Sequence, residues 1–205
     1  TPLYSSAASD VYKRQVLGCG NIGSVIARDL AENLRSAEIV MSDAVESRAK
    51  AAASETGRDN VSWLRVDASN HRELVKTLRT SDLAVGALPG SMGFQACKAA
   101  VAAGVDMVDV SYMPEDVMHL SKAAVKAGTC IVPDCGFSPG LSNILVGHAV
   151  SQLHTVESVH ILNGGLPEKP VPPLGYVITW SVKDLIDMYS RKPVIVKNGR
   201  VSVVE

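Results

Sequence analysis

The chain has 205 residues, with 20 Lys and Arg against 21 Asp and Glu and a formal net charge of −1. This balance excludes a polyanion-binding surface built on bulk charge, although not a local basic patch. Hydrophobic residues make up 46% and charged residues 20%, which is typical of a globular protein. Two Trp, five Tyr and two Phe are few for base stacking, so a nucleic-acid partner is not expected.

The sequence gives no sign of a membrane partner or a metal site. No apolar run approaches the roughly 18 residues that span a bilayer, and no signal peptide is visible. No C-x-x-C pair occurs, and His154 and His160 have no clustered ligand partner. We interpret the cysteines as reduced thiols of a cytoplasmic protein, each with burial as its ordinary role. They are Cys19, Cys97, Cys130 and Cys135.

The two ends of the chain differ from the rest. The opening TPLYSSAASDVYKRQ is polar and resembles translated adaptor sequence. A strand that leads into a dinucleotide loop is buried on both faces and should be apolar, which here fits only Val16 and Leu17. We therefore expect residues 1–15 to be a non-native leader and the strand to begin at Val16. At the other end, Val203-Val204-Glu205 interrupts a strand-like run, so we expect a truncated second domain.

Residues 16–135 alternate between short apolar runs and longer amphipathic runs. The six expected strands are Val16–Leu17, Glu38–Ser42, Val61–Val66, Leu83–Leu88, Val105–Val110 and Thr129–Val132. The five expected helices are Asn21–Leu34, Ala44–Ser54, Asn70–Leu78, Gly93–Ala103 and Pro114–Ala127. Gly104 and Gly128 each follow a helix, where a left-handed cap is favoured. This alternation predicts an α/β fold with a doubly wound parallel Rossmann sheet.

Residues 136–205 follow a different rhythm, which predicts the start of an α+β substrate domain. The turn-rich and loop segments are Asp134–Gly140 and Gly164–Pro173. The expected helices are Ser142–Gln152 and Val182–Tyr189, and the expected strands are Val156–Leu162, Tyr176–Trp180, Val194–Val196 and Arg200–Val204. The last two strands flank Asn198-Gly199, the strongest short signal for a hairpin.

The stretch VLGCGNIGSVIARDL predicts a dinucleotide site. Gly18, Gly20 and Gly23 have G-x-G-x-x-G spacing after a strand and at the start of a helix. A pyrophosphate would lie at the helix N-terminus, where free N–H groups and the helix dipole favour an anion. Asp43 ends the second strand about 20 residues after the last glycine, where a carboxylate accepts the ribose hydroxyls and repels a 2′-phosphate. NAD is therefore the expected cofactor, and NADP is the alternative because Arg48 follows closely.

Two further segments belong to this prediction. Asp67 ends the third strand, where it can bond the adenine edge or cap the following helix; both roles remain open. Ala87, Leu88 and Pro89 close the fourth strand at the switch point of the sheet, where ligands bind in open α/β sheets. Small residues there would let the nicotinamide ribose come close.

These segments together resemble the saccharopine dehydrogenase family, in particular its saccharopine dehydrogenase-like and lysine 6-dehydrogenase group. The resemblance runs from Val16 to Glu205 through VLGCGNIGSVIARDL, DLAVGALPGSMGFQACKAAVAAGVDMVDVSYMPED, PDCGFSPGLSN and NGGLPEKPVPPLGYVITWS. It implies a Rossmann domain, a central α+β catalytic domain and a C-terminal return segment. It also implies NAD(P)-dependent oxidation of an amino acid at a carbon bearing an amine, which gives an imine that water hydrolyses.

The resemblance also implies site residues. The cofactor-binding positions would be Gly18, Gly20, Asn21, Ile22, Gly23, Asp43, Asp67, Ala87, Leu88, Pro89, Val110 and Ser111. The substrate-binding positions would be Ser91, Met92, Ser111 and Tyr112. Saccharopine-binding relatives often have an acidic residue before the Pro-Gly turn, where this chain has Ser138. This departure argues against saccharopine itself as the substrate.

The chemistry needs a base that holds the substrate amine neutral before hydride transfer. Tyr112 and Asp134 follow the carboxyl ends of the fifth and sixth strands and are the candidates, with a hydrogen-bonded loop residue as the alternative for each. The expected partner is a small amino-acid substrate, and a homodimer is a candidate assembly. A second hypothesis is a regulatory protein that senses NAD(H) without turnover. It needs only the nucleotide domain, whereas residues 136–205 begin another layer.

Overall fold

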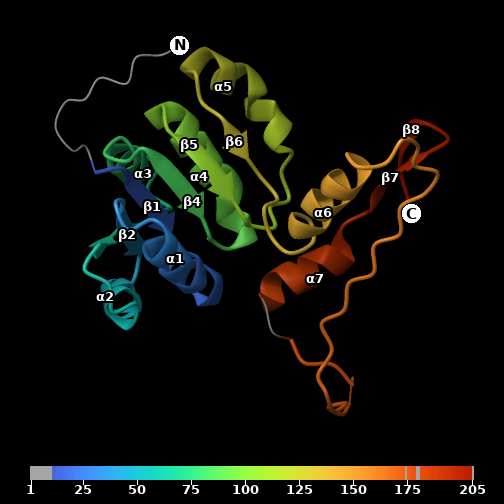
Figure 1. The fold of residues 1–205 in the computed structure, drawn as a ribbon, viewed down its shortest axis with the longest axis horizontal. Helices are drawn as coiled ribbons and strands as arrows, with labels where there is room; N and C mark the ends of the chain where they lie inside the picture. The colour runs from blue at the N-terminus through green and yellow to red at the C-terminus, as the bar shows by residue number, and fades with distance from the viewer. Residues whose placement is uncertain (1–10, 174, 179–180, 205) are drawn as a thin grey trace. The chain divides into compact units, whose positions relative to one another are not determined.

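The computed structural model describes residues 11–173, 175–178 and 181–204 (Figure 1). The chain divides into two compact units, one ending at Val159 and the other running from His160 to Glu205, and each is described by itself. Among the residues that the structure describes, no helix is both long and apolar enough to cross a membrane.

A six-stranded parallel sheet forms the centre of the first unit. Its strands are β1 (Lys13–Leu17), β2 (Glu38–Asp43), β3 (Val61–Arg65), β4 (Leu83–Gly86), β5 (Asp106–Asp109) and β6 (Ile131–Val132). They lie in the order β3-β2-β1-β4-β5-β6. The chain therefore starts in the middle of the sheet, winds to one edge, returns and winds to the other. This is the doubly wound order of a Rossmann fold, as predicted.

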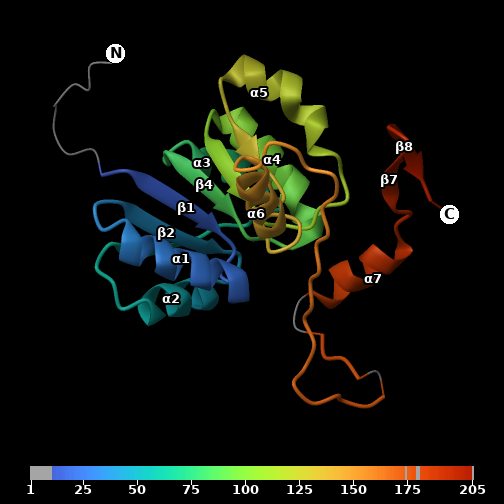
Figure 2. The same cartoon turned by 45° about the vertical axis from the view of Figure 1, so that its right-hand side comes forward.

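Helices cover both faces of this sheet (Figures 1 and 2). They are α1 (Asn21–Asn33), α2 (Glu46–Glu55), α3 (His71–Leu78), α4 (Gly90–Ala103) and the 3₁₀ helix η1 (Val117–Leu120). The first unit also contains α5 (Ser121–Ala127) and α6 (Leu141–Val150), neither of which has a buried residue. Side chains of neighbouring strand residues point to opposite faces, so Val16 packs with α1 and α2 while Leu17 packs with α3 and α4. Buried alanines on these helices let them approach the strands closely.

The predicted helix ends are confirmed at two glycines. Gly104 and Gly128 follow α4 and α5 with φ of 75° and 68°, the left-handed conformation that glycine adopts without strain. Two helices differ most from the prediction in where they begin. Helix α4 begins at Gly90 instead of Gly93, and the expected helix Pro114–Ala127 is shortened and divided into η1 and α5.

The start of β1 corrects a prediction. Lys13, Arg14 and Gln15 are part of the strand, paired with β2 and β4, so the expectation that the strand begins at Val16 is wrong. Gln15 is fully buried, and its Nε2 donates to the Val40 carbonyl at 3.1 Å. A polar side chain fits a central strand when a neighbouring strand supplies such a partner. That residues 1–15 are a non-native leader stays a prediction, and residues 1–10 lie outside the described residues.

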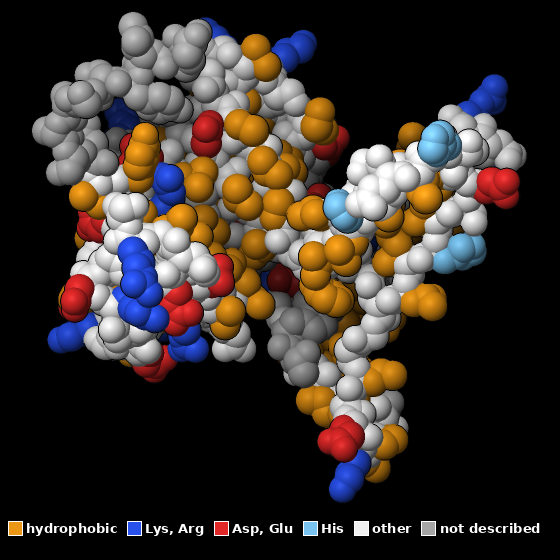
Figure 3. All heavy atoms as spheres, viewed as in Figure 1, with side chains coloured by type: hydrophobic (Ala, Val, Ile, Leu, Met, Phe, Trp, Pro, Cys, Tyr) orange, Lys and Arg blue, Asp and Glu red, His pale blue; other side chains and the backbone are white. Residues whose placement is uncertain are grey.

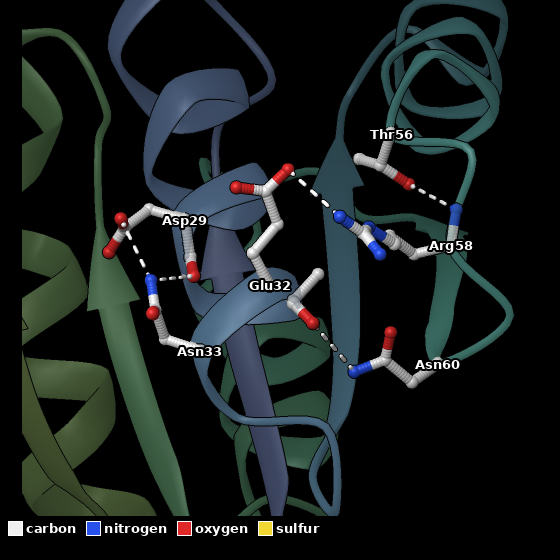
Figure 4. A network of polar contacts seen from close by, with 7 residues as sticks. Asp29, Glu32, Asn33, Thr56, Arg58 and Asn60 are labelled. Carbon is white, nitrogen blue, oxygen red and sulfur yellow. Dashed lines mark hydrogen bonds and ion pairs between the residues drawn. The ribbon is translucent and has the colours of Figure 1, made fainter.

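A polar network fixes the amino-terminal edge of the sheet (Figure 4). Arg58, in the loop before β3, forms an ion pair with Glu32 of α1 at 3.1 Å. Asn60 donates through Nδ2 to the carbonyl of Ala37, just before β2, at 3.0 Å. These contacts join the loops before β2 and β3 at the amino-terminal edge of the sheet. The loops that lead from each strand into the next helix lie at the opposite edge. On the face drawn in Figure 3, acidic and basic side chains are mixed over α1 and α2.

The second unit contains α7 (Val182–Ser190) and an antiparallel hairpin of β7 (Val194–Lys197) and β8 (Arg200–Val203). Its loop residues Asn198 and Gly199 have φ of 52° and 73°, which confirms the predicted hairpin turn. The expected strand Val156–Leu162 is not a strand, and neither are residues 176–178. A strand needs a paired neighbour, and the described residues supply none for these apolar segments. Residues 179–180 lie outside the described residues.

Candidate dinucleotide site

The glycine-rich turn between β1 and α1 combines two close contacts with one open position. Gly18 has φ of +97°, and a Cβ there would lie 2.5 Å from the Ala87 carbonyl oxygen. A Cβ on Gly23 would lie 1.9 Å from the Gly18 oxygen, so both positions need glycine for packing. A Cβ on Gly20 would meet nothing within 4 Å. The protein leaves this space free, as a closely approaching pyrophosphate requires.

The first turn of α1 has the character of an anion-binding end. The early N–H groups of a helix lack intrahelical carbonyl partners, and here they belong to Asn21, Ile22 and Gly23. No acidic side chain lies in this turn, and Asn21 and Ile22 are exposed. The helix dipole therefore adds a positive potential beside the space at Gly20.

Asp43 lies at the carboxyl end of β2, beside the glycine-rich turn. Its Oδ2 accepts the Cys19 N–H at 3.1 Å, and its Oδ1 accepts the Val45 N–H at 2.9 Å. The guanidinium of Arg48 lies 3.5 Å from Oδ2. The Asp43 side chain is only 10% exposed, whereas that of Arg48 is 57% exposed. The carboxylate is thus fixed from both sides in the place expected for the adenosine ribose.

The ends of β1, β4 and β5 are tied together at the same edge. The Ala87 N–H donates to the Leu17 carbonyl at 2.8 Å, and the Val110 N–H donates to the Gly86 carbonyl at 2.9 Å. Leu88 is partly buried and Pro89 precedes α4 as its N-cap residue. The structure therefore brings the predicted cofactor positions of three strands into one region.

Asp67 does not cap α3. The N-cap residue is Asn70, whose Oδ1 accepts the Glu73 N–H at 3.2 Å. Asp67 instead accepts both the N–H and the hydroxyl of Ser69, at 2.9 and 2.6 Å. These hydrogen bonds lower the pKa of Asp67 by stabilising its charged form. Of the two predicted roles, capping by Asp67 is therefore wrong, and contact with adenine stays a prediction.

Asp109 is a buried carboxyl group that the sequence analysis missed. It ends β5, is 0% exposed, and its Oδ1 accepts the N–H of Ser111 at 2.8 Å and the hydroxyl of the same residue. Its Oδ2 has no hydrogen-bond partner among the described residues. A Cβ on Gly86 would lie 1.8 Å from Oδ2, so the glycine makes room for the carboxyl group. The pKa of Asp109 is raised to about 6, chiefly by burial; the hydrogen bonds from Ser111 oppose this rise, and the nearby Asp134 contributes to it.

The predicted substrate and catalytic residues follow β4, β5 and β6. Ser111 is 4% exposed and its Oγ would lie 2.3 Å from a Cβ on Gly93, so its side chain packs beneath α4. Tyr112 is half-buried, and Asp134 is exposed with φ of 57°. The Cys135 N–H donates to the Asp109 carbonyl at 2.9 Å, which ties the segment after β6 to the end of β5. The roles of Tyr112 and Asp134 as bases stay predictions.

Ser91 and Met92 occupy the first turn of α4, next to this strand edge. Ser91 is exposed, and the Met92 N–H donates to the Pro89 carbonyl at 2.8 Å.

Within the described part of the chain, no three His, Cys, Asp or Glu residues are grouped to hold a metal ion. Cys19 and Cys97 are buried, and burial raises the pKa of each thiol to about 12.

The sheet order, the glycine-rich turn and the carboxylate at the end of β2 define a dinucleotide-binding Rossmann domain. Residues 15–132 match the family model described as the saccharopine dehydrogenase NADP binding domain. Residues 136–205 match the saccharopine dehydrogenase C-terminal domain. The chain belongs to the saccharopine dehydrogenase family, as the sequence resemblance predicted.

Curated relatives agree with this assignment. The chain is 24% identical over 195 residues to a saccharopine dehydrogenase [NADP(+), L-glutamate-forming] of Saccharomyces cerevisiae, covering 92% of this chain and 43% of the relative. It is 25% identical over 162 residues to a carboxyaminopropylagmatine dehydrogenase of Synechocystis, covering 74% and 40%. The chain thus spans less than half the length of these relatives.

A solved structure supports the fold. The apo saccharopine dehydrogenase (L-Glu forming) of Saccharomyces cerevisiae aligns with a TM-score of 0.70 at 21% identity. The alignment covers 94% of this chain and 44% of that chain.

Proposed function

We propose that the protein is an NAD(P)-dependent oxidoreductase that acts on the CH–NH group of an amino acid of the lysine or saccharopine type. The observation that carries this proposal is the open position at Gly20, between the N-terminus of α1 and the fixed carboxylate of Asp43. Family membership supports the same reaction class, since the curated relatives are named as dehydrogenases.

The chain's own residues would divide the work along the edge of the sheet. The N–H groups at the start of α1 would face the pyrophosphate, and Asp43 would accept a ribose hydroxyl. The residues from Ala87 to Pro89 would let the nicotinamide ribose approach the end of β4. The bound nicotinamide supplies the hydride acceptor.

Substrate activation would fall to the loops after β4, β5 and β6. Ser91, Met92 and Tyr112 would contact the amino acid. Tyr112 or Asp134 would take a proton from the substrate ammonium, because only a neutral nitrogen can form the C=N bond as the hydride leaves. Water then adds to the imine carbon and releases the amine.

The alternative of an NAD(H) sensor without turnover is less well supported. A sensor needs only the nucleotide domain, whereas residues 136–205 match the C-terminal domain of a dehydrogenase family. A cytoplasmic location and a homodimeric assembly remain predictions. The relatives include an alpha-aminoadipic semialdehyde synthase of Bos taurus that is named as mitochondrial.

A nucleotide titration followed by fluorescence tests the proposal. Gly20→Val places a side chain where the protein has free space, so it should abolish NADH binding and leave the melting temperature unchanged. Gly147→Ala is the matched control, because a Cβ there also meets nothing within 4 Å, and it should bind as wild type does. Unaltered NADH binding by Gly20→Val would contradict the proposed site.

A turnover assay then separates the enzyme from the sensor. The chain covers 43% of its Saccharomyces cerevisiae relative, so the assay compares the 205-residue chain with a version extended to the length of that relative. We expect the first to bind NAD without turnover and the second to reduce NAD in the presence of lysine, saccharopine or a related amino acid. NAD binding without turnover in the extended version, across that panel, would favour the sensor. Amine-dependent NADH production by the 205-residue chain would show that its catalytic groups are already complete.

A further inference from the structure

The loop after β5 packs two residues into the protein and presents the one between them. The Met113 N–H donates to the Ser111 carbonyl at 3.1 Å, which closes a three-residue turn with Tyr112 at its apex. Ser111 is 4% exposed and Met113 is 9% exposed, whereas Tyr112 is half-buried. Both ends of the turn are therefore held, and Tyr112 is its most accessible residue.

Helix α4 provides the surface against which the two ends of this turn pack. A Cβ on Gly93 would lie 2.3 Å from Ser111 Oγ and 3.0 Å from Met113 Cε. Glycine at this position therefore lets the turn lie directly beneath the helix. The Ser111 hydroxyl is enclosed between α4 and Asp109, so it is not offered to a bound ligand.

Asp109 anchors the turn from the sheet. Its Oδ1 accepts the N–H of Ser111 at 2.8 Å and the hydroxyl of the same residue. Its main chain is fixed as well, because it pairs with Gly86 of β4 and its carbonyl accepts the Cys135 N–H at 2.9 Å. Hydrogen bonds to an ionised carboxylate are about twice as strong as those between neutral groups. Two such bonds from a fixed strand residue determine where the turn lies.

A buried carboxyl group is a costly anchor for a loop. Asp109 is 0% exposed, and its Oδ2 has no hydrogen-bond partner among the described residues. Burying a carboxyl group with one unsatisfied oxygen destabilises a fold. Such departures from good packing are expected where the ordered segment serves a function.

We infer that Asp109 is a positioning residue of the reaction, which acts through Ser111 to hold Tyr112 at the carboxyl edge of the sheet. This inference rests on the proposed function, because it assumes that Tyr112 meets the amino-acid substrate. The Ser111 hydroxyl then serves Asp109 and not a ligand. Tyr112 meets the substrate already in place, so little ordering of the loop remains for the reaction.

Hydrogen exchange in the 205-residue chain tests the anchor without any turnover. Asp109→Ala should speed exchange of the Ser111 and Met113 amides by at least about tenfold. Asp109→Asn should stay close to wild type, because its amide oxygen can accept the same N–H. Asp106→Ala is the matched control, since Asp106 lies at the other end of β5 and its carboxylate also accepts a backbone N–H, from Cys130 at 2.7 Å. Unchanged exchange of the Ser111 amide in Asp109→Ala would overturn the inference and leave the proposed function intact.

Turnover by the extended version tests the consequence for the reaction. Asp109→Ala should lower kcat by about tenfold to a hundredfold, the effect of misplacing a reacting group by about 1 Å. The KM for NAD should stay within about threefold of wild type. Asp109→Asn should keep most of the wild-type kcat. In a Tyr112→Ala background, Asp109→Ala should lower kcat no further, because the two residues act as one unit.

The outcomes separate this inference from the proposed function. Wild-type kcat in Asp109→Ala, or an equal loss with and without Tyr112, would overturn the inference. Gly93→Ala pushes on Ser111 from the α4 side and should lower kcat in the same way, so it carries the test where Asp109→Ala does not fold. Wild-type kcat in Gly93→Ala would count against the inference equally. No turnover by the wild-type extended version would overturn the proposed function, and the inference with it.

Discussion

Asp109 makes the stability of the first unit depend on pH in a way that one substitution can remove. Its carboxyl group has a pKa of about 6 in the folded protein, against an ordinary value of 3.8. Between these two values the folded state holds a proton that the unfolded state has lost. The free energy of unfolding therefore falls as pH rises through this window. The difference of roughly two pKa units lowers the free energy of unfolding by about 3 kcal/mol across this window. Above the folded pKa, this group no longer makes the free energy of unfolding depend on pH.

Asp109→Asn removes the titration and keeps the shape. The amide oxygen can still accept the Ser111 N–H, while the amide nitrogen takes the position of Oδ2, which has no partner among the described residues. An unpaired buried N–H group costs about 1–3 kcal/mol, so the absolute stability of the variant is a poor test. The test is the free energy of unfolding of the variant minus that of the wild type. This difference should increase by about 3 kcal/mol from about pH 4 to about pH 7.

Urea unfolding at several pH values measures this difference. Trp63 lies in β3, so its fluorescence reports on the first unit. Asp59→Asn is the control, because Asp59 is exposed in the loop before β3. This substitution should leave the change of the free energy of unfolding with pH as it is in the wild type. A difference between Asp109→Asn and wild type that stays constant over the whole range would refute the argument from burial.

Two further predictions concern buried groups elsewhere in the first unit. In the native protein, an aromatic disulfide reagent should modify the exposed Cys130 quickly and leave Cys19 and Cys97 unmodified. Burial hides these two thiols and raises the pKa of each to about 12. Prompt labelling of three or more thiols would contradict this prediction. Gln15→Leu should raise the free energy of unfolding by about 1 kcal/mol, because it removes the unpartnered Oε1 and keeps the side-chain volume. A lower melting temperature would show that losing the hydrogen bond to the Val40 carbonyl costs more than removing Oε1 gains.

The sheet and its order were predictable because each strand and helix has its own local signal. Apolar runs, glycine caps such as Gly104, and the Asn198-Gly199 turn are readable without knowing any neighbour. The wrong predictions concern segments whose structure depends on whether a neighbouring strand lies beside them. Gln15 belongs to a central strand because the carbonyl of Val40 lies beside it, and the apolar run 156–162 is not a strand because the described residues offer it no pairing edge.

The same distinction holds for the candidate site. Gly18, Gly20, Gly23 and Asp43 are recognisable because their spacing along the chain fixes their geometry at one turn. The importance of Asp109 could not be predicted, because its burial arises from the packing of β4 and α4 against the end of β5. The strand carries acidic residues at both ends, Asp106 and Asp109, of which the first is exposed and the second buried, and nothing in the sequence distinguishes the two.

The placement of Asp109 links the stability of the sheet to the loop that carries the candidate base. Its Oδ1 holds the backbone and hydroxyl of Ser111, and its own carbonyl accepts the Cys135 N–H. The carboxyl group thereby fixes the residue just before Tyr112, and the main-chain carbonyl of Asp109 fixes the residue just after Asp134, in the two loops that carry the proposed bases. An apolar residue in its place would remove the cost of burying a charge, but it would also release both hydrogen bonds to Ser111. The buried carboxyl group, with its unpartnered Oδ2, is therefore the consequence of ordering the loop that follows β5.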